Sequence, residues 1–561
     1  MSILKNKVFI LYLFITITFF GMLIKLEYAT DTYAVFNFDK EAVYMQYAMS
    51  GRFIIGAFLK FFKIINISEK LTYEISYLLA ILCAALSQFI LYVIIRNLDV
   101  QVTEQPYESK GNNFVDSEKD TKSKVLKIII PKLIIINPFS IELFLFIEKG
   151  FMWLGILACV LALMNLQKYF ENSKSKNLVN DNKTEKIKRM LPKNIGAKRY
   201  LFYSLILMFI ANCLYQGVVG IFLSVALVFI LKYSKNIRKV ASPHVQVASQ
   251  PHESKKLNLV ASEKSSDFSY EIKEFIVNNF IAGSIYAIPA LINFLFVKIK
   301  FKESRINGRI VILDSVEKIW QNTCNMFKTM YGILPKYTFI LLILFTFAVF
   351  CSKIWKEEKK LLPILKFIYI IVGITFIAIA PQILQPTNLI WFAPRSTYSF
   401  ASMYGILTLY LAMNYELKGI SKYAIVILSV MLLTFQAQKF INIEKDRYLL
   451  NNNDKKITMQ IAKHIKAYEE TTGNTVTELS WYEDEKPNYT YNGIFATSDM
   501  NVKSYSSDWS TVEILKYFLK RDIKLVKKDM NLTKEFKSKN WDEFDEMQIL
   551  FEKNKLNICN Y

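Results

Sequence analysis

Long apolar runs recur through the first 441 residues of the chain. Each run is close to the roughly 20 residues that a helix needs to cross a bilayer. We place eleven predicted transmembrane helices at residues 8–24, 71–95, 126–145, 151–166, 199–215, 217–232, 275–298, 337–354, 361–384, 397–413 and 422–440. The pattern therefore predicts a polytopic α-helical membrane protein, with residues 1–441 as its transmembrane domain.

After residue 441 the pattern changes to short apolar stretches separated by polar turns. This alternation is typical of a small domain that mixes helices and strands. We expect residues 442–561 to form a small α/β or α+β domain. The segment contains no phosphate-binding loop, no GxGxxG and no zinc-ligand spacing, so its sequence indicates no nucleotide or zinc site.

Charge on the loops sets the predicted orientation. Lys5 and Lys7 precede the first span, and residues 167–199 hold ten Lys or Arg against three acidic residues. Because positive residues stay on the cytoplasmic side, both segments belong there. Eleven spans that start inside place residues 442–561 outside, and the near-balanced charge of that segment fits translocation. The first apolar run is followed by Lys25 rather than by a small-residue cleavage site, so we expect it to remain as an anchor.

The span count depends most on residues 200–232. These 33 residues provide two helices of only about 16 residues, shorter than a usual span. A single span here would reverse every later loop and move the basic loop 233–274 outside, which the charge rule opposes. We therefore keep two short spans, one of which we expect to tilt or re-enter.

Composition agrees with a membrane protein and limits the chemistry. Of the 561 residues, 53% are hydrophobic, and the formal net charge is +22. The excess Lys and Arg lie in predicted cytoplasmic loops, so topology explains the charge and no nucleic-acid partner is implied. The three histidines lie outside the spans, which excludes a histidine metal site or a Ser-His-Asp relay within the membrane. The six cysteines form no CxxC pair and are expected to be small buried residues.

Two segments in the predicted cytoplasmic inserts, 96–125 and 233–274, repeat each other. Residues 99–120 and 244–265 are identical at 13 of 22 positions, with VQV, QP, ESK and SEK in register. Both are polar and lack the apolar period of a packed helix or strand. We interpret them as inserted, largely disordered sequence in surface loops, with a docking segment as the alternative.

Ionisable residues near the spans indicate where function lies, because a charge close to lipid is costly without a partner or a role. Under the predicted topology, four polar segments lie on the outer face. They are the first outer loop 25–52 with Glu27, Asp31, Asp39, Glu41 and Arg52, the turn 137–151 with Glu142, Glu148 and Lys149, the turn at Tyr215 and Gln216, and the loop 385–400 with Trp391, Pro394 and Arg395. Their convergence predicts one site on that face.

Carboxylates beside arginines suit the transfer of a group from a lipid phosphate to a hydroxyl. A carboxylate takes the proton of the attacking hydroxyl, and guanidinium groups hold the phosphate and its developing charge. A phosphate departs as a stable anion, so one base suffices. Each residue also has a plainer interpretation: solvated loop carboxylates, interfacial anchors for Arg52 and Arg395, a hairpin cap for Tyr215 and Gln216, and an aromatic belt for Trp391.

Taken in order, these segments resemble the type II glucosyltransferase family of membrane proteins, known from serotype-converting glucosylation of O-antigen, whose architecture is like that of GT-C glycosyltransferases. The matching pieces are the acidic first outer loop closed by Gly51-Arg52, NPF…FIEKG at 137–150, Leu214-Tyr215-Gln216, Ala393-Pro394-Arg395, and Asp508-Trp509 in the terminal domain. The resemblance covers most of the chain except the two repeated segments. Each motif is short, so the specificity lies in their order and spacing.

The resemblance implies an inverting transfer of a hexose, typically glucose, from a polyprenyl-phosphate carrier to a cell-surface glycan, on the outer face of the bacterial plasma membrane. The residues assigned on this basis are Asp31 as general base, Glu148 as second carboxylate, Arg52 and Arg395 as phosphate ligands, and Tyr215, Gln216, Lys149 and Trp391 as substrate-binding residues. Glu148 stands where the family pattern has an aspartate. Participation of Mg²⁺ or Mn²⁺ stays open, because carboxylates are present but no DxD triplet.

Two other functions remain open. A polysaccharide polymerase or ligase that uses a polyprenyl-pyrophosphate glycan would also need outer arginines, but would more often use a large loop between late spans. A lipid-linked sugar flippase or transporter would be expected to show an inverted repeat and helices broken by Gly or Pro at mid-membrane. The chain has only 17 Gly, and its polar residues cluster at one face instead of mid-span.

Overall fold

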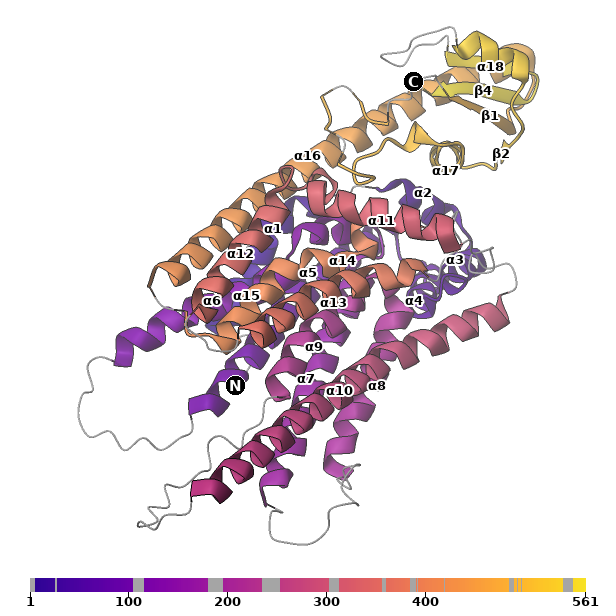
Figure 1. Ribbon diagram of the computed structural model, residues 1–561. Helices are drawn as coiled ribbons and strands as arrows, with labels where there is room; N and C mark the ends of the chain where they lie inside the picture. Colours follow the sequence, from indigo (N-terminus) through magenta and orange to yellow (C-terminus); the bar gives the residue numbers. More distant parts are fainter. Residues whose placement is uncertain are drawn as a thin grey trace.

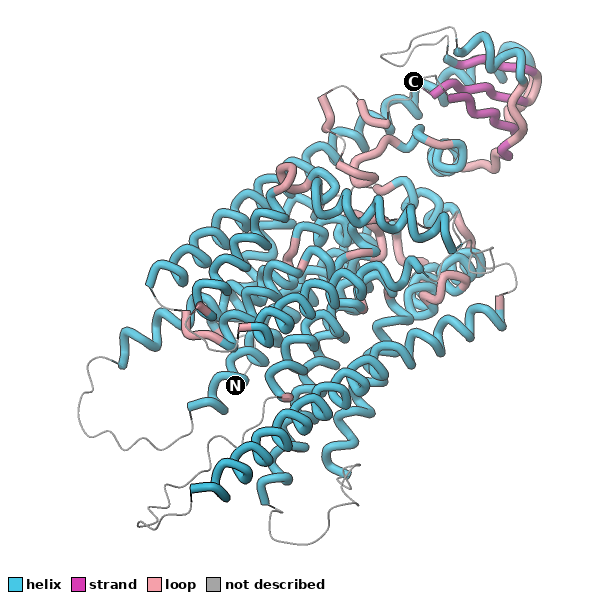
Figure 2. Tube along the Cα trace, in the orientation of Figure 1, coloured by secondary structure: helices cyan, strands magenta, loops and turns pink. Residues whose placement is uncertain are grey.

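The computed structural model describes residues 6–25, 28–103, 116–179, 195–234, 253–301, 312–355, 360–383, 390, 392–417, 419–483, 489–491, 493–495, 497–537 and 548–560. These residues form a bundle of long helices that carries a small mixed domain at one end (Figure 1). Within the described part of the chain, strands occur in that small domain alone (Figure 2).

Among the described residues, eight helical segments are long and apolar enough to cross a membrane. They are centred on α1 (Lys7–Phe20), α5 (Glu69–Thr103), α7 (Lys149–Val179), α8 (Ile195–Leu214), α9 (Gly220–Tyr233), α10 (Glu253–Lys300), α13 (Leu361–Ile383) and α16 (Gly419–Thr472), and the shorter apolar helix α12 (Thr338–Ile354) coincides with a further predicted span. This architecture fits a helical membrane protein.

Large apolar side chains cover the outside of the bundle. Phe280 on α10 exposes 75% of its surface, Leu361 on α13 exposes 70%, and Phe14 on α1 exposes 68%. Such a surface is unfavourable in water and favourable in lipid, which matches its apolar groups and demands no hydrogen bonds from the outer helix faces. The exposed residues therefore agree with a bundle whose outer surface contacts a membrane.

The structure differs from the predicted spans at two places, and the first is the predicted span 126–145. There α6 (Asp116–Ile135) ends early and the 3-10 helix η3 (Pro138–Phe144) follows. The proline that opens η3 cannot continue an α-helix. The Asn137 side chain accepts a hydrogen bond from the Phe139 amide at 2.9 Å and caps the new turn. The chain therefore leaves the helix just before the turn that carries the predicted carboxylates.

The second difference is in the predicted span 397–413. This segment is split into α14 (Tyr398–Ala401) and α15 (Met403–Asn414). In the break between them, the Ser402 hydroxyl donates to the Ile134 carbonyl at 2.8 Å. The break thus packs against the end of α6, so two interruptions that are far apart in sequence stabilise each other.

Short helices lie across the end of the bundle that faces the small domain, here called the domain-side end (Figure 1). They are α2 (Thr30–Asn37), α3 (Lys40–Ala48), α4 (Phe53–Ile64) and α11 (Ile312–Thr329), and the 3-10 turns of the connections are η2 (Gly21–Ile24), η4 (Gln216–Val218), η7 (Met330–Gly332) and η9 (Pro394–Ser396). Phe58 and Phe61 on α4 are 44% and 51% exposed. These exposed rings suit a short helix that lies at the membrane interface.

The small domain grows out of α16, a single helix of 54 residues. This helix passes the expected boundary at residue 441 without a break and ends before Gly473, whose φ is +70°. The remaining elements are β1 (Glu478–Glu483), η10 (Ser504–Ser506), α17 (Asp508–Leu519), β2 (Lys524–Leu525), α18 (Met530–Lys537), β3 (Ile549–Glu552) and β4 (Lys555–Asn560). The strand order is β2-β1-β4-β3, with β1 parallel to β2 and β4, and β3 antiparallel to β4.

The described parts of the two repeated segments are helical. α5 continues to Thr103, α6 begins at Asp116 and α10 begins at Glu253, all within segments expected to be largely disordered. Residues 104–115 and 235–252 lie outside the described residues. In their described parts, the polar repeats therefore extend the long helices of the bundle.

Candidate active site

Three turns and one short helix bring the predicted polar residues together at the domain-side end. The 3-10 turn η9 contacts both η3 and η4, so the segments around Glu142, Tyr215 and Arg395 are neighbours. The first loop joins them through Arg52, whose guanidinium carbon lies 4.5 Å from the centroid of the Tyr215 ring. Residues from four separate parts of the sequence thus form one cluster.

Arg395 and Glu142 form a buried ion pair within this cluster. Pro394 opens η9 and presents the next amide, that of Arg395, to Glu142. This amide donates to Glu142 Oε2 at 2.5 Å, and Arg395 Nη1 donates to Oε1 at 2.6 Å. Glu142 is completely buried, whereas the Arg395 side chain is 12% exposed. The sequence prediction gave Arg395 to a donor phosphate without this partner, and the structure shows that its charge is already balanced by a carboxylate.

Arg52 and Glu148 face each other less tightly. Arg52 Nη1 lies 4.0 Å from Glu148 Oε1, and the Arg52 side chain is 28% exposed. Burial raises the pKa of the Glu148 carboxyl, and the Arg52 charge opposes that rise. Arg52 Nε has no hydrogen-bond partner among the described residues. Because Nε is buried while the side chain as a whole is 28% exposed, the exposed part of the guanidinium is the part that a ligand could reach.

Tyr47 of α3 adds a phenol to the Arg52–Glu148 pair. Its side chain lies close enough to the Glu148 carboxylate to interact with its charge. Burial raises the pKa of Tyr47 well above its ordinary value, and the negative charge of Glu148 adds to this rise. The phenol therefore stays protonated beside this pair.

Tyr215 separates the two ion pairs. Its ring is 3% exposed, and it interacts electrostatically with all four charged residues of the pairs. A Cβ on Gly217 would lie 2.5 Å from the Arg395 carbonyl oxygen and 2.7 Å from Tyr215 Cε1. Glycine at this position is what lets η4 and η9 approach so closely, so Gly217 sets the spacing between the pairs.

The Gln216 side chain makes a hydrogen bond to the backbone of the first loop. Its Nε2 donates to the Ser50 carbonyl at 3.1 Å, and Asn293 of α10 donates to the Gly51 carbonyl at 3.0 Å. Gly51 has a φ of +75°, and a Cβ there would lie 2.7 Å from Gln216 Nε2. These amides hold the turn that leads into Arg52, which gives Gln216 a positioning role that the sequence did not indicate.

Asp31 lies at the edge of the cluster, in the first turn of α2, with its side chain exposed. Its charge interacts with those of Glu148 and Arg395. Within the described part of the chain, no hydrogen bond or ion pair occupies its carboxylate. An exposed carboxylate next to buried, paired charges has the chemistry of a general base for a bound hydroxyl.

Two predicted substrate contacts are not placed in the cluster. Lys149 is completely buried, and its Nζ lies 3.5 Å from the centroid of the Tyr73 ring. Lys149 therefore packs between helices rather than facing a substrate, which corrects the sequence prediction. The other residue, Trp391, lies outside the described residues.

The small domain contributes a carboxylate that sequence analysis missed. Asp499 is exposed, and its charge interacts with Glu142. The neighbouring Met500 is 2% exposed and belongs to the apolar core of the bundle, while its carbonyl accepts from Arg447 Nη1 at 3.1 Å. These contacts fix the turn at the cluster. The sequence carries no local signal for this, because the turn lies in a polar stretch of the terminal domain.

No group of three or more His, Cys, Asp or Glu that could hold a metal ion occurs among the described residues. The carboxylates of the cluster are instead paired with arginines or, for Asp31 and Asp499, exposed singly.

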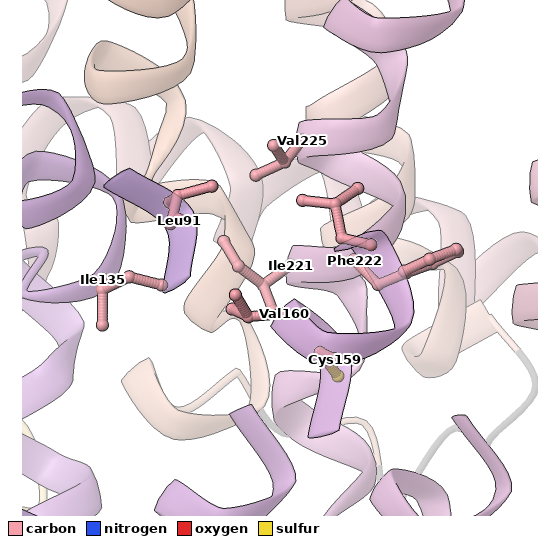
Figure 3. Close-up of a pocket in the computed structure, with 8 residues that line it drawn as sticks. Leu91, Ile135, Cys159, Val160, Ile221, Phe222 and Val225 are labelled. Carbon is pink, nitrogen blue, oxygen red and sulfur yellow. The ribbon is translucent and has the colours of Figure 1, made fainter. Parts of the chain in front are cut away.

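A small gap in the bundle interior lies apart from this cluster. Figure 3 shows its lining residues, all of them apolar or cysteine: Leu91, Ile135, Cys159, Val160, Leu163, Ile221, Phe222 and Val225. They come from α5, α6, α7 and α9, and the gap is too narrow to hold a water molecule. It is an imperfection of packing and offers nothing to a sugar or a phosphate.

Comparison with known proteins leaves these residues as the basis for any functional conclusion. No protein-family model matches the chain, and no curated protein or solved structure matches it.

Proposed function

We propose that the chain is a membrane glycosyltransferase that transfers a hexose, with glucose as the first candidate, from a polyprenyl-phosphate carrier to a cell-surface glycan. The observation that carries the proposal is that Glu148 interacts both with the partly exposed guanidinium of Arg52 and with the exposed carboxylate of Asp31. These groups supply a cation for a phosphate and a base for a hydroxyl. Their place between apolar helices and a polar domain suits a substrate with a lipid tail and a sugar head.

In the proposed reaction, an acceptor hydroxyl oxygen attacks C1 of the hexose from the face opposite the phosphate. The new C1–O bond forms while the bond between C1 and the phosphate oxygen breaks, so the configuration at C1 inverts. Both electrons of the broken bond leave with the polyprenyl phosphate, and Asp31 takes the proton of the hydroxyl. Arg52 binds the phosphate oxygens and stabilises the charge that the leaving group gains.

Glu148 and Arg395 take supporting roles in this reaction. Glu148 orients the Arg52 guanidinium from 4.0 Å. Arg395 is held by Glu142 and fixes the η9 turn behind the site. From the sequence, Arg52 and Arg395 are expected to be equivalent phosphate ligands. In this proposal Arg52 is instead the primary contact of the donor phosphate.

We further propose that the site faces the outside of a bacterial plasma membrane. α8 reaches the cluster at its C-terminal end, so its basic beginning, with Lys198 and Arg199, lies at the other end of the bundle. The N-terminus lies away from the small domain as well (Figure 1). Positive residues at that end favour a cytoplasmic position for it, which leaves the cluster and the small domain outside.

The test of the proposed function is a transfer assay with the wild type and Arg52→Gln. Labelled hexose on polyprenyl phosphate is the donor, and extracted cell-surface glycan is the acceptor. We expect Arg52→Gln to raise the donor KM by about 10- to 100-fold, because a charge-assisted hydrogen bond to phosphate is lost. Lys60→Gln is the matched control. Lys60 lies on α4, the helix that begins just after Arg52, but it pairs with Glu41 at 2.7 Å. We expect this control to keep the wild-type KM.

Two outcomes would count against this assignment. An unchanged donor KM in a folded Arg52→Gln variant would move the phosphate contact to Arg395. Absence of transfer by the wild type with any polyprenyl-phosphate hexose would reject the proposed function in favour of a polymerase or a flippase.

Glu148 gives the proposed activity an expected pH dependence. Because burial raises the pKa of Glu148, acidification protonates it at a higher pH than an exposed glutamate and removes its charge from Arg52. Protonated glutamate resembles glutamine in shape and charge. We therefore expect the ratio of kcat/KM between wild type and Glu148→Gln to fall towards one as the pH is lowered. A ratio that stays constant across the acid range would show that the charge of Glu148 is not used.

A further inference from the structure

The helix that carries Asp31 is held at its beginning by the stalk of the small domain. Asn451 of α16 forms a paired contact with the backbone of Tyr28: its Oδ1 accepts from the Tyr28 amide at 2.9 Å, and its Nδ2 donates to the Tyr28 carbonyl at 2.5 Å. Arg447, one turn earlier on α16, donates to the same carbonyl at 2.7 Å. The chain is thus fixed three residues before Asp31.

The end of the same helix is held by α17. Asn37, the last residue of α2, donates from Nδ2 to the Glu513 carbonyl and to its carboxylate Oε2, both at 2.7 Å. Tyr517 on α17 donates to Glu69 Oε2 of α5 at 2.5 Å, which ties α17 to the bundle. α2 is therefore clamped between two elements of the small domain, and that domain is clamped to the bundle.

Part of the apolar surface of α2 packs against the small domain as well, while Val35 packs against the bundle. Tyr28 and Tyr33 are part of the small domain's hydrophobic cluster, together with residues of α16, α17 and the sheet. The Tyr28 and Tyr33 rings lie edge-on to the Tyr517 ring, with centroids 5.7 Å and 5.3 Å apart. A helix of eight residues is too short to be stable alone. The position of Asp31 is therefore set by the small domain.

We propose that the small domain is the positioning device for Asp31, acting through Asn451, Arg447 and Glu513. The inference rests on the proposed function, and it assigns to the domain a role in proton removal rather than in donor binding. Arg52 and Arg395 are held by other elements, namely α4 with its preceding turn and η9 with η3. A change in the clamp is therefore expected to affect kcat and leave the donor KM unchanged.

Three consecutive asparagines provide the test. Asn451 makes the clamp contact, whereas the side chain of Asn453, two residues further on α16, makes no hydrogen bond to another described residue. We expect Asn451→Ala to lower kcat by about tenfold with an unchanged donor KM, because small displacements of a reacting group cost up to about a hundredfold in rate. Asn453→Ala, the same change on the same helix, is expected to stay within about twofold of wild type.

A double variant separates positioning from a general structural effect. If Asn451 acts through Asp31, Asn451→Ala should cause no further loss in an Asp31→Asn background, because the group that it positions is already gone. A tenfold loss in both backgrounds would overturn the proposal.

Hydrogen exchange gives a readout that does not need activity. Loss of two hydrogen bonds is expected to speed amide exchange in residues 30–37 by about tenfold in Asn451→Ala, with the bundle helices unchanged. Unchanged exchange in these residues would overturn the clamp whatever the activity. Absence of transfer by the wild type would instead reject the proposed function, so the two failures are distinguishable.

Discussion

Asp31→Asn is expected to lower kcat by about a thousandfold, within the range of 10²–10⁴ that a general base contributes. The amide keeps the shape of the side chain but cannot accept the hydroxyl proton. Because Asp31 is exposed and its carboxylate makes no hydrogen bond or ion pair with a described residue, the substitution should leave folding and the donor KM unchanged. Single-turnover transfer from polyprenyl-phosphate glucose measures the chemical step directly.

Asp39→Asn is the matched control for this prediction. Asp39 is also exposed in the first loop, but it caps α3 by accepting from the amides of Glu41 and Ala42 at 2.8 Å and 2.7 Å. Asparagine caps a helix as well as aspartate does, so this variant should keep both fold and activity within about twofold. If Asp39→Asn lost as much activity as Asp31→Asn, the base would have been assigned to the wrong carboxylate of the loop.

The long helices were predictable because their signal is local. An apolar run long enough to cross lipid leaves a helix as the only way to satisfy its backbone. The helix end before Pro138 also has a local cause, although the apolar run continues past it and hides it. The break at Ser402 has no such cause, because it depends on Ile134, which lies 268 residues away in sequence.

The sequence predicted which segments form the candidate site, but it did not predict which arginine pairs with which carboxylate. The topology rule placed Asp31, Arg52, Glu148 and Arg395 on one face, and the structure brings them together. The partner of Arg395 was not predictable, because Glu142 lies 253 residues away and no local pattern distinguishes it from Glu148. From the sequence, Glu142 and Glu148 were equally plausible partners for an arginine. In the structure Glu142 is completely buried, whereas Glu148 lies 4.0 Å from Arg52.

The terminal domain shows the same limit. Its strands and helices follow from short apolar stretches, but α16 continues across residue 441 because no glycine or proline interrupts the helix between Gly419 and Gly473. The incorporation of Tyr28 and Tyr33 into the domain core joins segments about 400 residues apart. The change in composition after residue 441 therefore indicated where the domain lies. It did not reveal that Tyr28 and Tyr33 of the first loop are part of the hydrophobic core of this domain.

Glu142→Ala is expected to destabilise the protein by about 3–5 kcal/mol, the usual cost of removing one partner of a buried ion pair. Arg395 loses the carboxylate at 2.6 Å that balances its charge, and its backbone amide loses an acceptor at 2.5 Å. Thermal unfolding in detergent measures the loss. The control is Glu41→Ala: Glu41 also lies 2.7 Å from a cation, Lys60, but is 63% exposed, so its loss should cost less than about 1 kcal/mol.

A double variant decides whether the uncompensated charge is the cause. In Glu142→Gln with Arg395→Met, the glutamine oxygen still accepts the amide of residue 395 and no buried charge remains. Replacing a buried pair by uncharged groups is often close to neutral, so the double variant should be more stable than Glu142→Gln alone. Equal instability of the single and double variants would instead assign the cost to packing around η3, and the ion pair would then matter for shape rather than for charge.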